Sequence, residues 1–411
     1  MRRLRLMLAL AALALAAPAV AQGQSDYIVV FRDGTDVDAV VDEHVAQHGA
    51  DVSHRYYHAL DGYAARMTTV AYAAIRQDAR VLFVSENRAV RPSSLCDPTA
   101  LQCLPTGIDR IDADLSSAVS GDGAGAVDVN VAVLDTGIDL THPDLNVAGG
   151  VSCQESAGLD DKNGHGTHVA GIIGAKDNGY GVVGVAPGAR LWVARVLNQG
   201  GHTGPQGSAE GGLDELVCGV DWVTSTRTDL DPTNDIAVAN MSLEGRGSDD
   251  GNCGLSNGDP LHLAICNSVA AGVLYVVAAG NSGVDLRDTI SASYDEVLTA
   301  TMMWDTDGQP GGLNQSSFPG RFSKLCVARD DTYIAFSNFA RLPADRARVI
   351  AAPGVCIAST LQGGNYEGYF GGTSMAAAHV SGTAALCIAA GACHGEPAQI
   401  MQKLIGDARS Y

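Results

Sequence analysis

Short apolar segments alternate with amphipathic segments along this chain, and a first group of them lies within residues 26–92. Each apolar segment is a run of four or five residues bounded by polar or turn-forming residues such as Asp33 and Gly34, which is typical of a strand. We therefore expect a small α/β unit with three strands and two helices. The predicted strands are 27–31, 63–67 and 81–84, and the predicted helices are 37–48 and 70–78.

From about residue 107 the apolar runs become more continuous and alternate with helical segments. Continuous apolar strands separated by helices indicate a mostly parallel sheet covered by helices on both faces, which is an α/β fold. Glycine accounts for 49 of the 411 residues, above the usual proportion of about 7%, as expected for many tight turns. The predicted strands are 127–134, 191–197, 236–241 and 273–277, and the predicted helices are 165–175, 208–226 and 261–271.

The amino-terminal segment has the three parts of a secretory signal peptide. A basic start is followed by an apolar run over 6–15 and by small residues that end at Ala21. We therefore expect a secreted protein, extracellular or periplasmic, that is cleaved after Ala21. The predicted domains are a signal peptide 1–21, a small domain 22–92 and a large domain 93–411, with an exposed linker at 91–94 and a maturation site within 88–96.

The acidic charge of the chain is confined to its larger part. The net charge is −20, yet the first 92 residues contain ten basic and ten acidic residues, so the excess lies entirely after them. Such a surface repels nucleic acid and anionic membranes, and we expect neither as a partner. Solubility is the simplest role of this charge, and basic substrates would gain some steering from it.

The ten cysteines all lie from Cys96 onward, and in an exported protein this even number predicts up to five disulfides. No Cys-x-x-Cys pair occurs, so a zinc ribbon is not expected. Only cysteines that are close in sequence can be paired from the sequence. The expected pairs are Cys96–Cys103, Cys253–Cys266 and Cys387–Cys393, whereas Cys153, Cys218, Cys326 and Cys356 remain unassigned.

Four polar residues occupy positions where the functional side chains of a parallel α/β sheet usually lie. Asp135 ends the first strong strand and Asn281 follows another, and the carboxyl ends of parallel strands lie at one edge of a sheet. His165 begins a predicted helix, and Ser374 lies between a Gly pair and an Ala-rich helix. Individually, each has an ordinary structural alternative as a cap or a turn residue. Together, an acid, a base, a hydroxyl and an amide donor favour nucleophilic catalysis.

A metal site is the alternative for the histidine motif. His165 and His168 are three residues apart, a spacing that suits metal ligands on one helix. However, the HExxH pattern with its general-base glutamate is absent, and no third ligand is obvious. We therefore interpret His165 as a general base and assign no catalytic metal.

The four stretches, in their order along the chain, resemble those of the subtilisin-like serine proteases, most closely the proteinase K branch. The resemblance extends from about residue 26 to the end. It implies that Asp135 orients the base His165, that Ser374 is the nucleophile, and that Asn281 donates to the oxyanion.

The same resemblance implies further roles. Residues 26–92 are similar to the prodomain of the family, an intramolecular chaperone and inhibitor, so the expected partners are polypeptide substrates and the chain's own prodomain. A monomer is expected, and no cofactor is required for catalysis. The implied substrate-binding residues are Ser242, Leu243, Glu244, Gly245, Ala279 and Gly280, whereas His168 and His379 match histidines that are not catalytic in the family.

The chain departs from the family pattern in three places. Ala378 stands where the family usually has Pro, and because Ala sustains a helix we expect no loss of activity. Glu244 replaces a common Gly; it either favours basic substrate side chains or points into solvent. The chain also ends at Tyr411, sooner after Ser374 than is general in the family, so a final strand or helix is expected to be absent.

The segment 304–308 contains two carboxylates, Asp305 and Asp307, followed by Gly308. Oxygen-only ligands suit calcium, which the family often binds structurally, so a structural calcium site is one interpretation. An acidic surface loop is the other. The wider region 305–325 is rich in Gly and Ser and is interpreted as an inserted loop.

Three functional hypotheses follow. The first is a secreted serine endopeptidase made as a self-processing zymogen, acting through an Asp-His-Ser triad and an acyl-enzyme. The second is a catalytically dead relative that binds peptides or inhibits, which the complete set of four residues disfavours. The third is a metal-dependent hydrolase that uses His165 and His168.

Overall fold

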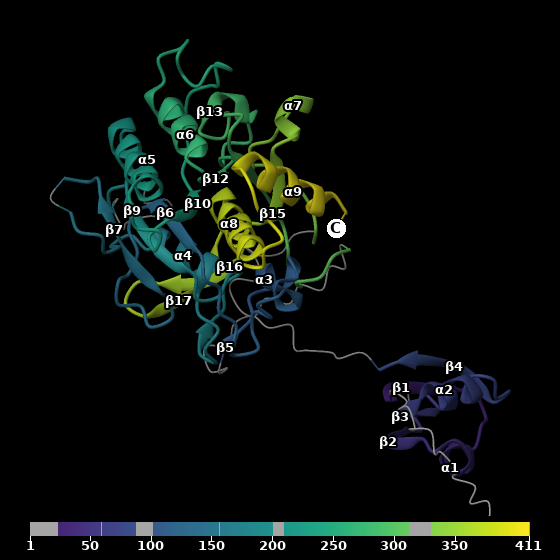
Figure 1. The fold of residues 1–411 in the computed structure, drawn as a ribbon. Coiled ribbons are helices and arrows are strands. Elements are labelled where there is room, and N and C mark those ends of the chain that lie inside the picture. Colours follow the sequence, from purple (N-terminus) through teal and green to yellow (C-terminus); the bar gives the residue numbers. More distant parts are fainter. Residues whose placement is uncertain are drawn as a thin grey trace, which may run out of the picture. The chain divides into compact units, whose positions relative to one another are not determined.

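A computed structural model describes residues 24–58, 60–87, 102–155, 157–199, 209–311 and 330–410 of the chain (Figure 1). The predicted signal peptide, the predicted linker and the predicted maturation site all fall outside these residues. Cys96, Cys326 and most of the predicted 305–325 loop also lie outside them. No helix within the described ranges is both long enough and apolar enough to cross a bilayer.

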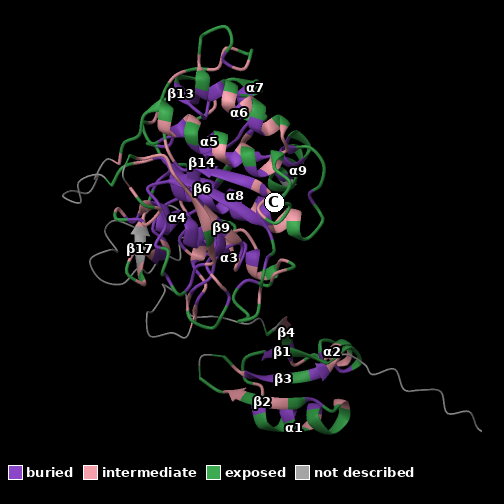
Figure 2. Ribbon diagram, turned by 60° about the vertical axis from the view of Figure 1, so that its left-hand side comes forward, coloured by how far each residue is buried: buried purple, intermediate pink, exposed green. Residues whose placement is uncertain are grey.

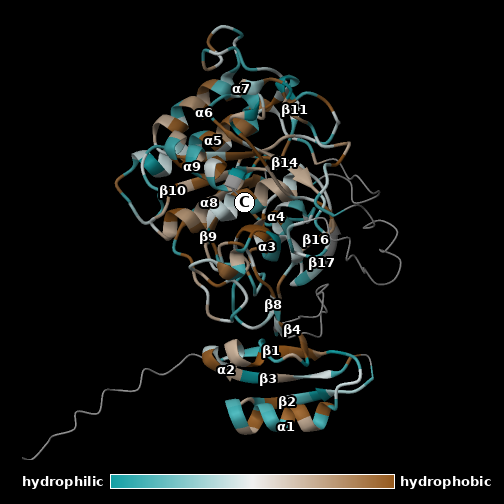
Figure 3. Ribbon diagram, turned by 90° about the vertical axis from the view of Figure 1, so that its right-hand side faces the viewer, coloured by the Kyte–Doolittle hydropathy of each residue, from teal (hydrophilic) through white to brown (hydrophobic). Residues whose placement is uncertain are grey.

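The chain divides into two compact units between Pro92 and Ser93. The first unit is an antiparallel sheet of four strands in the order β2-β3-β1-β4, packed against two helices. Its helix α1 (Val37–His48) begins at Asp36, whose side chain caps the Ala39 amide, and it alternates polar and apolar residues along its length (Figure 3). The other elements are β1 (Gln24–Phe31), β2 (Asp51–Tyr56), β3 (Gly62–Thr68), α2 (Thr69–Ile75) and β4 (Val81–Glu86).

The second unit is built on a seven-stranded sheet in the order β15-β14-β12-β10-β6-β9-β7, and every neighbouring pair is parallel. This confirms the predicted parallel α/β fold. The strands are β6 (Asn130–Asp135), β7 (Val147–Ser152), β9 (Arg190–Arg195), β10 (Ile236–Met241), β12 (Leu274–Ala278), β14 (Leu298–Met303) and β15 (Val349–Pro353).

Helices cover both faces of this sheet, as predicted. Val131 and Val133 of β6 point into one core together with α4, α8 and α9, whereas Ala132 and Leu134 point into a second core with α5 and α6. The central strands β6, β10, β12 and β14 and most of α8 are almost entirely buried, whereas the edge strands β7 and β15 are partly exposed (Figure 2). The helices are α4 (His165–Gly174), α5 (Leu213–Thr228), α6 (Pro260–Ala270), α8 (Thr373–Ala389) and α9 (Pro397–Ser410).

Helix α8 continues without a break through Ala378, so alanine sustains this helix as expected. Helix α5 begins at Leu213 and not near residue 208 as predicted, because Gly211 and Gly212 precede it and glycine disfavours a helix interior. The smaller elements of the second unit are β5 (Gln102–Cys103), α3 (Thr106–Arg110), η1 (Ala113–Leu115), β8 (Gly181–Val182), β11 (Gly245–Arg246), η2 (Leu286–Asp288), β13 (Thr289–Ile290), α7 (Pro343–Arg346), β16 (Ile357–Leu361) and β17 (Asn365–Phe370).

Disulfides link cysteines at three places within the described residues. Two of the predicted pairs, Cys253–Cys266 and Cys387–Cys393, are present. A third bond joins Cys153 to Cys218, a pair that sequence spacing could not reveal because 65 residues separate them. Cys103 and Cys356 are also disulfide-bonded.

Candidate active site

Asp135 and His165 lie at the carboxyl edge of the sheet. Asp135 is the last residue of β6, is fully buried, and accepts a hydrogen bond from the Thr136 amide at 2.7 Å. His165 is the first residue of α4, and its Nδ1 lies 2.8 Å from Asp135 Oδ1. Its side chain is 27% exposed, so the imidazole is accessible from solvent while its partner is not. This arrangement fixes the ring and leaves Nε2 for chemistry.

The start of α4 approaches β6 so closely that only glycine fits there. A Cβ on Gly166 would lie 2.1 Å from the backbone oxygen of Gly137 and 3.2 Å from Asp135 Cβ. The Gly166 amide also donates to the Thr136 hydroxyl at 3.0 Å. The Gly that follows His165 in the sequence motif therefore permits the short contact between the histidine and the acid.

The electrostatic environment favours the protonated form of His165. Burial alone would lower its pKa, but the charge of Asp135, the hydrogen bond to Asp135 and the charge of Asp161 raise the pKa above its ordinary value of 6.5. An imidazole that gains a proton readily, held by a buried carboxylate, is suited to act as a general base.

Asp161 is a positioning residue that the sequence analysis did not identify. It is 1% exposed and accepts hydrogen bonds from the amides of Asn163, Gly164 and Thr167, which form the turn into α4. It also accepts from the hydroxyls of Thr136 and Thr167, at 3.0 and 2.7 Å. Its place four residues before His165 was a usable signal, because an acid there can cap the turn that presents the histidine.

Ser374 is the second residue of α8 and is largely buried. Its hydroxyl donates to the backbone oxygen of Ser242 at 3.2 Å, and the Ser242 hydroxyl donates to the Ser374 backbone oxygen at 2.8 Å. None of the hydrogen bonds among the described residues joins Ser374 to His165. The structure therefore holds the serine at the helix N-terminus, where backbone amides favour negative charge, but not yet hydrogen-bonded to the base.

Asn281 follows β12 and lies beside the start of α8. Its side-chain oxygen accepts hydrogen bonds from the Thr373 amide at 2.9 Å and the Thr373 hydroxyl at 3.2 Å. This bonding fixes the orientation of the side chain, and no hydrogen bond in the described part of the chain uses its Nδ2. The amide group therefore remains available as a donor next to Ser374.

The carboxylate of Glu244 lies next to Asn281. Its Oε2 accepts a hydrogen bond from the Asn281 backbone amide at 2.8 Å. Gly280, the residue before Asn281, has a φ of +103°. A Cβ at this position would lie 2.3 Å from both Glu244 Oε2 and Asn338 Nδ2. Glycine at this position is thus required for Glu244 to approach. The side chain is exposed, yet the hydrogen bond holds it at the site.

The segment that contains Glu244 has a free backbone edge. Residues 242–244 follow directly after β10, and no hydrogen bond of the described residues involves the backbone of Leu243 or Glu244. Gly245, by contrast, pairs with Ile290 in the ribbon of β11 and β13. Ala279 is buried, and its backbone oxygen accepts from Asn338. Of the predicted substrate-binding residues, Leu243 and Glu244 therefore offer the open backbone.

The remaining histidines of the motifs have structural roles. His168 is fully buried, bonds the Ile357 backbone oxygen at 3.0 Å and stacks on Phe370. His379 is fully buried within α8, and burial lowers its pKa to about 4, so it is neutral. Among the described residues, no group of possible metal ligands includes His165 or His168. The two histidines thus do not fit the metal-site alternative.

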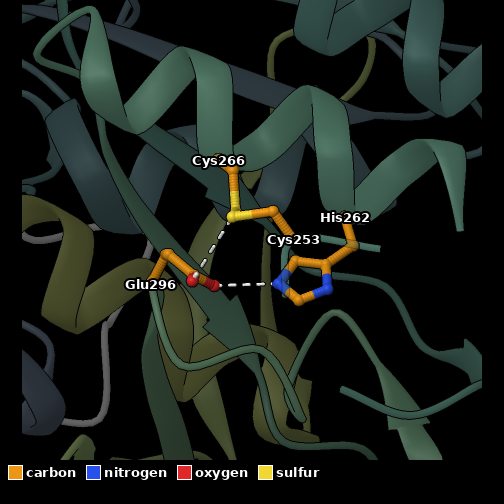
Figure 4. A group of neighbouring side chains, drawn as sticks. All are labelled: Cys253, His262, Cys266 and Glu296. Carbon is orange, nitrogen blue, oxygen red and sulfur yellow. Dashed lines mark hydrogen bonds and ion pairs between the residues drawn. A yellow bond between two sulfur atoms is a disulfide. The ribbon is translucent and has the colours of Figure 1, made fainter. Parts of the chain in front are cut away.

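Besides a group formed by Asp249, Asp250 and His262, the described part of the second unit contains two groups of acidic and ligand-type side chains. In the first, Cys253 and Cys266 form a disulfide, and Glu296 accepts from His262 at 2.9 Å (Figure 4). Because both sulfurs are oxidised, this group lacks the thiolates that a zinc site requires. The second group joins the predicted residues Asp305 and Asp307 to Asp330.

Comparisons with known proteins agree with this geometry. Residues 127–410 match the subtilase family of peptidases, and residues 26–93 match the peptidase inhibitor I9 family. The chain therefore belongs to the subtilase family and is a serine endopeptidase that carries an inhibitor-type prodomain.

Its relatives include subtilisins of Bacillus. It is 31% identical to subtilisin NAT of Bacillus subtilis subsp. natto over 346 residues, which cover 84% of this chain and 74% of that protein. It is 34% identical to the subtilisin of Bacillus pumilus over 289 residues, 70% of this chain and 85% of that protein. A solved structure of a cold adapted subtilisin-like serine proteinase is 28% identical, with a TM-score of 0.47, and covers 68% of this chain and 80% of that one.

Proposed function

We propose that Asp135, His165 and Ser374 form the catalytic triad of a secreted endopeptidase. The observation that carries this proposal is the 2.8 Å contact between His165 Nδ1 and the buried carboxylate of Asp135, at the sheet edge where Ser374 begins α8. His165 takes the Ser374 proton as the hydroxyl attacks the peptide carbonyl, and it gives that proton to the leaving amine as the tetrahedral intermediate collapses to the acyl-enzyme. A water molecule, deprotonated by His165, then hydrolyses the acyl-enzyme and restores the Ser374 hydroxyl. Asp135 holds the tautomer and stabilises the imidazolium.

The oxyanion of the tetrahedral intermediate is stabilised by the Asn281 side-chain amide and the Ser374 backbone amide. Neither step needs a cofactor. Before attack, the Ser374 hydroxyl leaves the Ser242 backbone oxygen and rotates toward His165, a change of one χ1 angle that apo sites commonly require. Substrate adds as a strand along Leu243 and Glu244, where the backbone is open.

The chain is made as a zymogen in this proposal. Residues 1–21 direct export, residues 22–92 fold and inhibit the peptidase unit, and the peptidase unit 93–411 removes them by its own activity and then works as a monomer. The match of residues 26–93 to an inhibitor family and the division of the chain at Pro92 support this scheme. The disulfides suit an oxidising compartment.

A serine-directed organophosphate tests the proposed function. We expect it to abolish peptide hydrolysis and to add one phosphonyl group to the tryptic peptide containing Ser374, because only an activated serine reacts. A chelator present for the few minutes of the assay should leave this labelling unchanged. Labelling of another residue, or activity that disappears on chelation while labelling persists, would contradict the triad. An absence of both labelling and hydrolysis would instead favour a catalytically dead relative.

Glu244 is expected to select basic substrate side chains. Its carboxylate is held 2.8 Å from the Asn281 amide, next to the path of the substrate, so a Lys or Arg there gains an ion pair. In a peptide library, Glu244→Gly should lose about five-fold of the preference for basic over neutral residues near the cut. Glu244→Gln is the matched control, because it retains an acceptor for Asn281 and loses only the charge. Identical cleavage profiles for all three proteins would mean that Glu244 does not affect specificity.

A further inference from the structure

Three carboxylates, two of them buried and one half-buried, lie close together beyond the end of β14. Asp305 and Asp330 are 1% and 2% exposed, and Asp307 is half-buried. One ligand oxygen from each residue lies within 4.8 Å of those of the other two. Because like charges at such distances repel strongly away from water, the group needs a cation or protons among the oxygens.

Each of these carboxylates has one oxygen satisfied by the protein and one that is not. Asp305 Oδ1 accepts from the Gly308 amide at 3.0 Å, and Asp330 Oδ1 accepts from the Thr306 amide and hydroxyl at 2.8 and 3.0 Å. Asp307 Oδ1 accepts from the amide two residues further on. The Oδ2 atoms of all three residues are buried and have no hydrogen-bond partner. Native proteins seldom leave such atoms unpaired, and an ion is one of the usual partners.

Within the part of the chain that the structure describes, no ion pair joins a basic side chain to Asp305, Asp307 or Asp330. Arg110 is engaged with Asp331, 2.8 Å from its carboxylate.

We propose that Asp305, Asp307 and Asp330 bind a Ca²⁺ ion. Carboxylate oxygens without nitrogen or sulfur ligands select hard cations, and two oxygens on opposite sides of Ca²⁺ are about 4.6–5.2 Å apart. The three ligand oxygens, which all lie within 4.8 Å of one another, are therefore close enough to share one Ca²⁺ ion. Asp330 was not predicted as a ligand, because it lies far from Asp305 and Asp307 in the sequence.

The ion would link the segment after β14 to the segment that begins at Asp330, at the carboxyl ends of the parallel strands. Trp304 is already paired with the segment after Asp330, because its amide donates to the Thr332 oxygen at 2.9 Å. Strand β14 lies directly beside β12, which leads into Asn281. Binding of Ca²⁺ therefore stabilises the edge that carries the oxyanion donor, and it does so whether or not the triad is correctly assigned.

Calcium binding is tested on the full chain carrying Ser374→Ala, so that self-cleavage is removed. We expect isothermal titration with CaCl₂ to show one site fewer in Asp330→Asn than in the parent, or an affinity at that site reduced at least about ten-fold. Calcium should raise the melting temperature of the parent by more than that of the variant. Asp231→Asn is the matched control and should bind calcium as the parent does. It removes an exposed charge that precedes β10, at the amino-terminal ends of the parallel strands, whereas the proposed site lies beyond the carboxyl end of β14.

Terbium luminescence tests the site without altering its ligands. Tb³⁺ is a common probe of calcium sites, and excitation of the adjacent Trp304 should sensitise its emission, which excess CaCl₂ should suppress. Trp304→Phe should lose most of this emission while it retains the titrated binding. If parent and Asp330→Asn bind calcium with the same stoichiometry and affinity, the proposal is wrong. It is also overturned if calcium has no effect while Asp307→Asn raises the melting temperature, because the group would then be held by a shared proton.

Discussion

Ser374→Ala accumulates at the size of the unprocessed precursor and loses about 10⁶-fold in peptide hydrolysis, the loss typical of removing the nucleophile of such a triad. Alanine fits this buried position at the start of α8, because it removes only one hydroxyl and the hydrogen bond to Ser242. The fold should therefore persist, and the variant should show the circular dichroism of the unprocessed parent.

Expression in a host without other secreted proteases, followed by amino-terminal sequencing, checks this result. Wild type should yield a species that begins between about residues 88 and 96, whereas Ser374→Ala should retain the prodomain. Ser225→Ala, which removes an exposed hydroxyl on α5, serves as the control and should mature normally. If the Ser374 variant matures to the same terminus in that host, self-cleavage is excluded.

Asp135→Asn should lower kcat by about 10⁴-fold at neutral pH, because the imidazole loses both its charged partner and the control of its tautomer. Asp135 Oδ1 receives the Thr136 amide as well as His165, so an asparagine oxygen in that position keeps the local fold and removes the charge. The structure should thus remain intact while catalysis fails.

The pH profile separates this cause from a general loss of structure. His165 must be neutral to act as the base, and its pKa in the wild type is raised above 6.5, so activity should fall as the pH decreases through that raised value. The charge of Asp135 contributes to the elevation, and in Asp135→Asn the acid limb should therefore move to lower pH. Activity within ten-fold of wild type, or an unshifted limb, contradicts the assigned role.

The sequence predicts the elements whose signal is local. Asp135 and Asn281 were found because each follows a continuous apolar strand, and helix α1 was predicted with the bounds that the structure shows. Strand β2 was missed because its residues are mostly exposed or half-buried and lack apolar alternation. Strand β7 contains Gly149 and Gly150 at an edge of the sheet, and glycine weakens the strand pattern.

The parts of the site that were not predicted depend on partners far apart in the chain. Asn240 donates to the Ser242 hydroxyl and accepts from Ser381, and this network orients the backbone that holds Ser374. Asp330 meets Asp305 across an intervening segment that carries no helix or strand signal. These residues come together only when the strands of the sheet pair and α8 packs against them. Their spacing along the sequence therefore does not reveal the contacts.

The strand order of the large sheet has a consequence for when this enzyme becomes active. The proposed acid and base, Asp135 and His165, lie on β6 and α4, whereas the proposed nucleophile Ser374 lies on α8, more than 200 residues later. These groups meet only after the strands between them have paired. Such non-local contacts form late, because the chain entropy of closing long loops must be overcome first. If the chain is exported as proposed, a partly exported chain would contain the histidine but no assembled nucleophile, and it would be unable to degrade itself or its neighbours. The strand order would thus delay assembly of the proposed active site, and with it proteolysis, until nearly the whole chain has been exported.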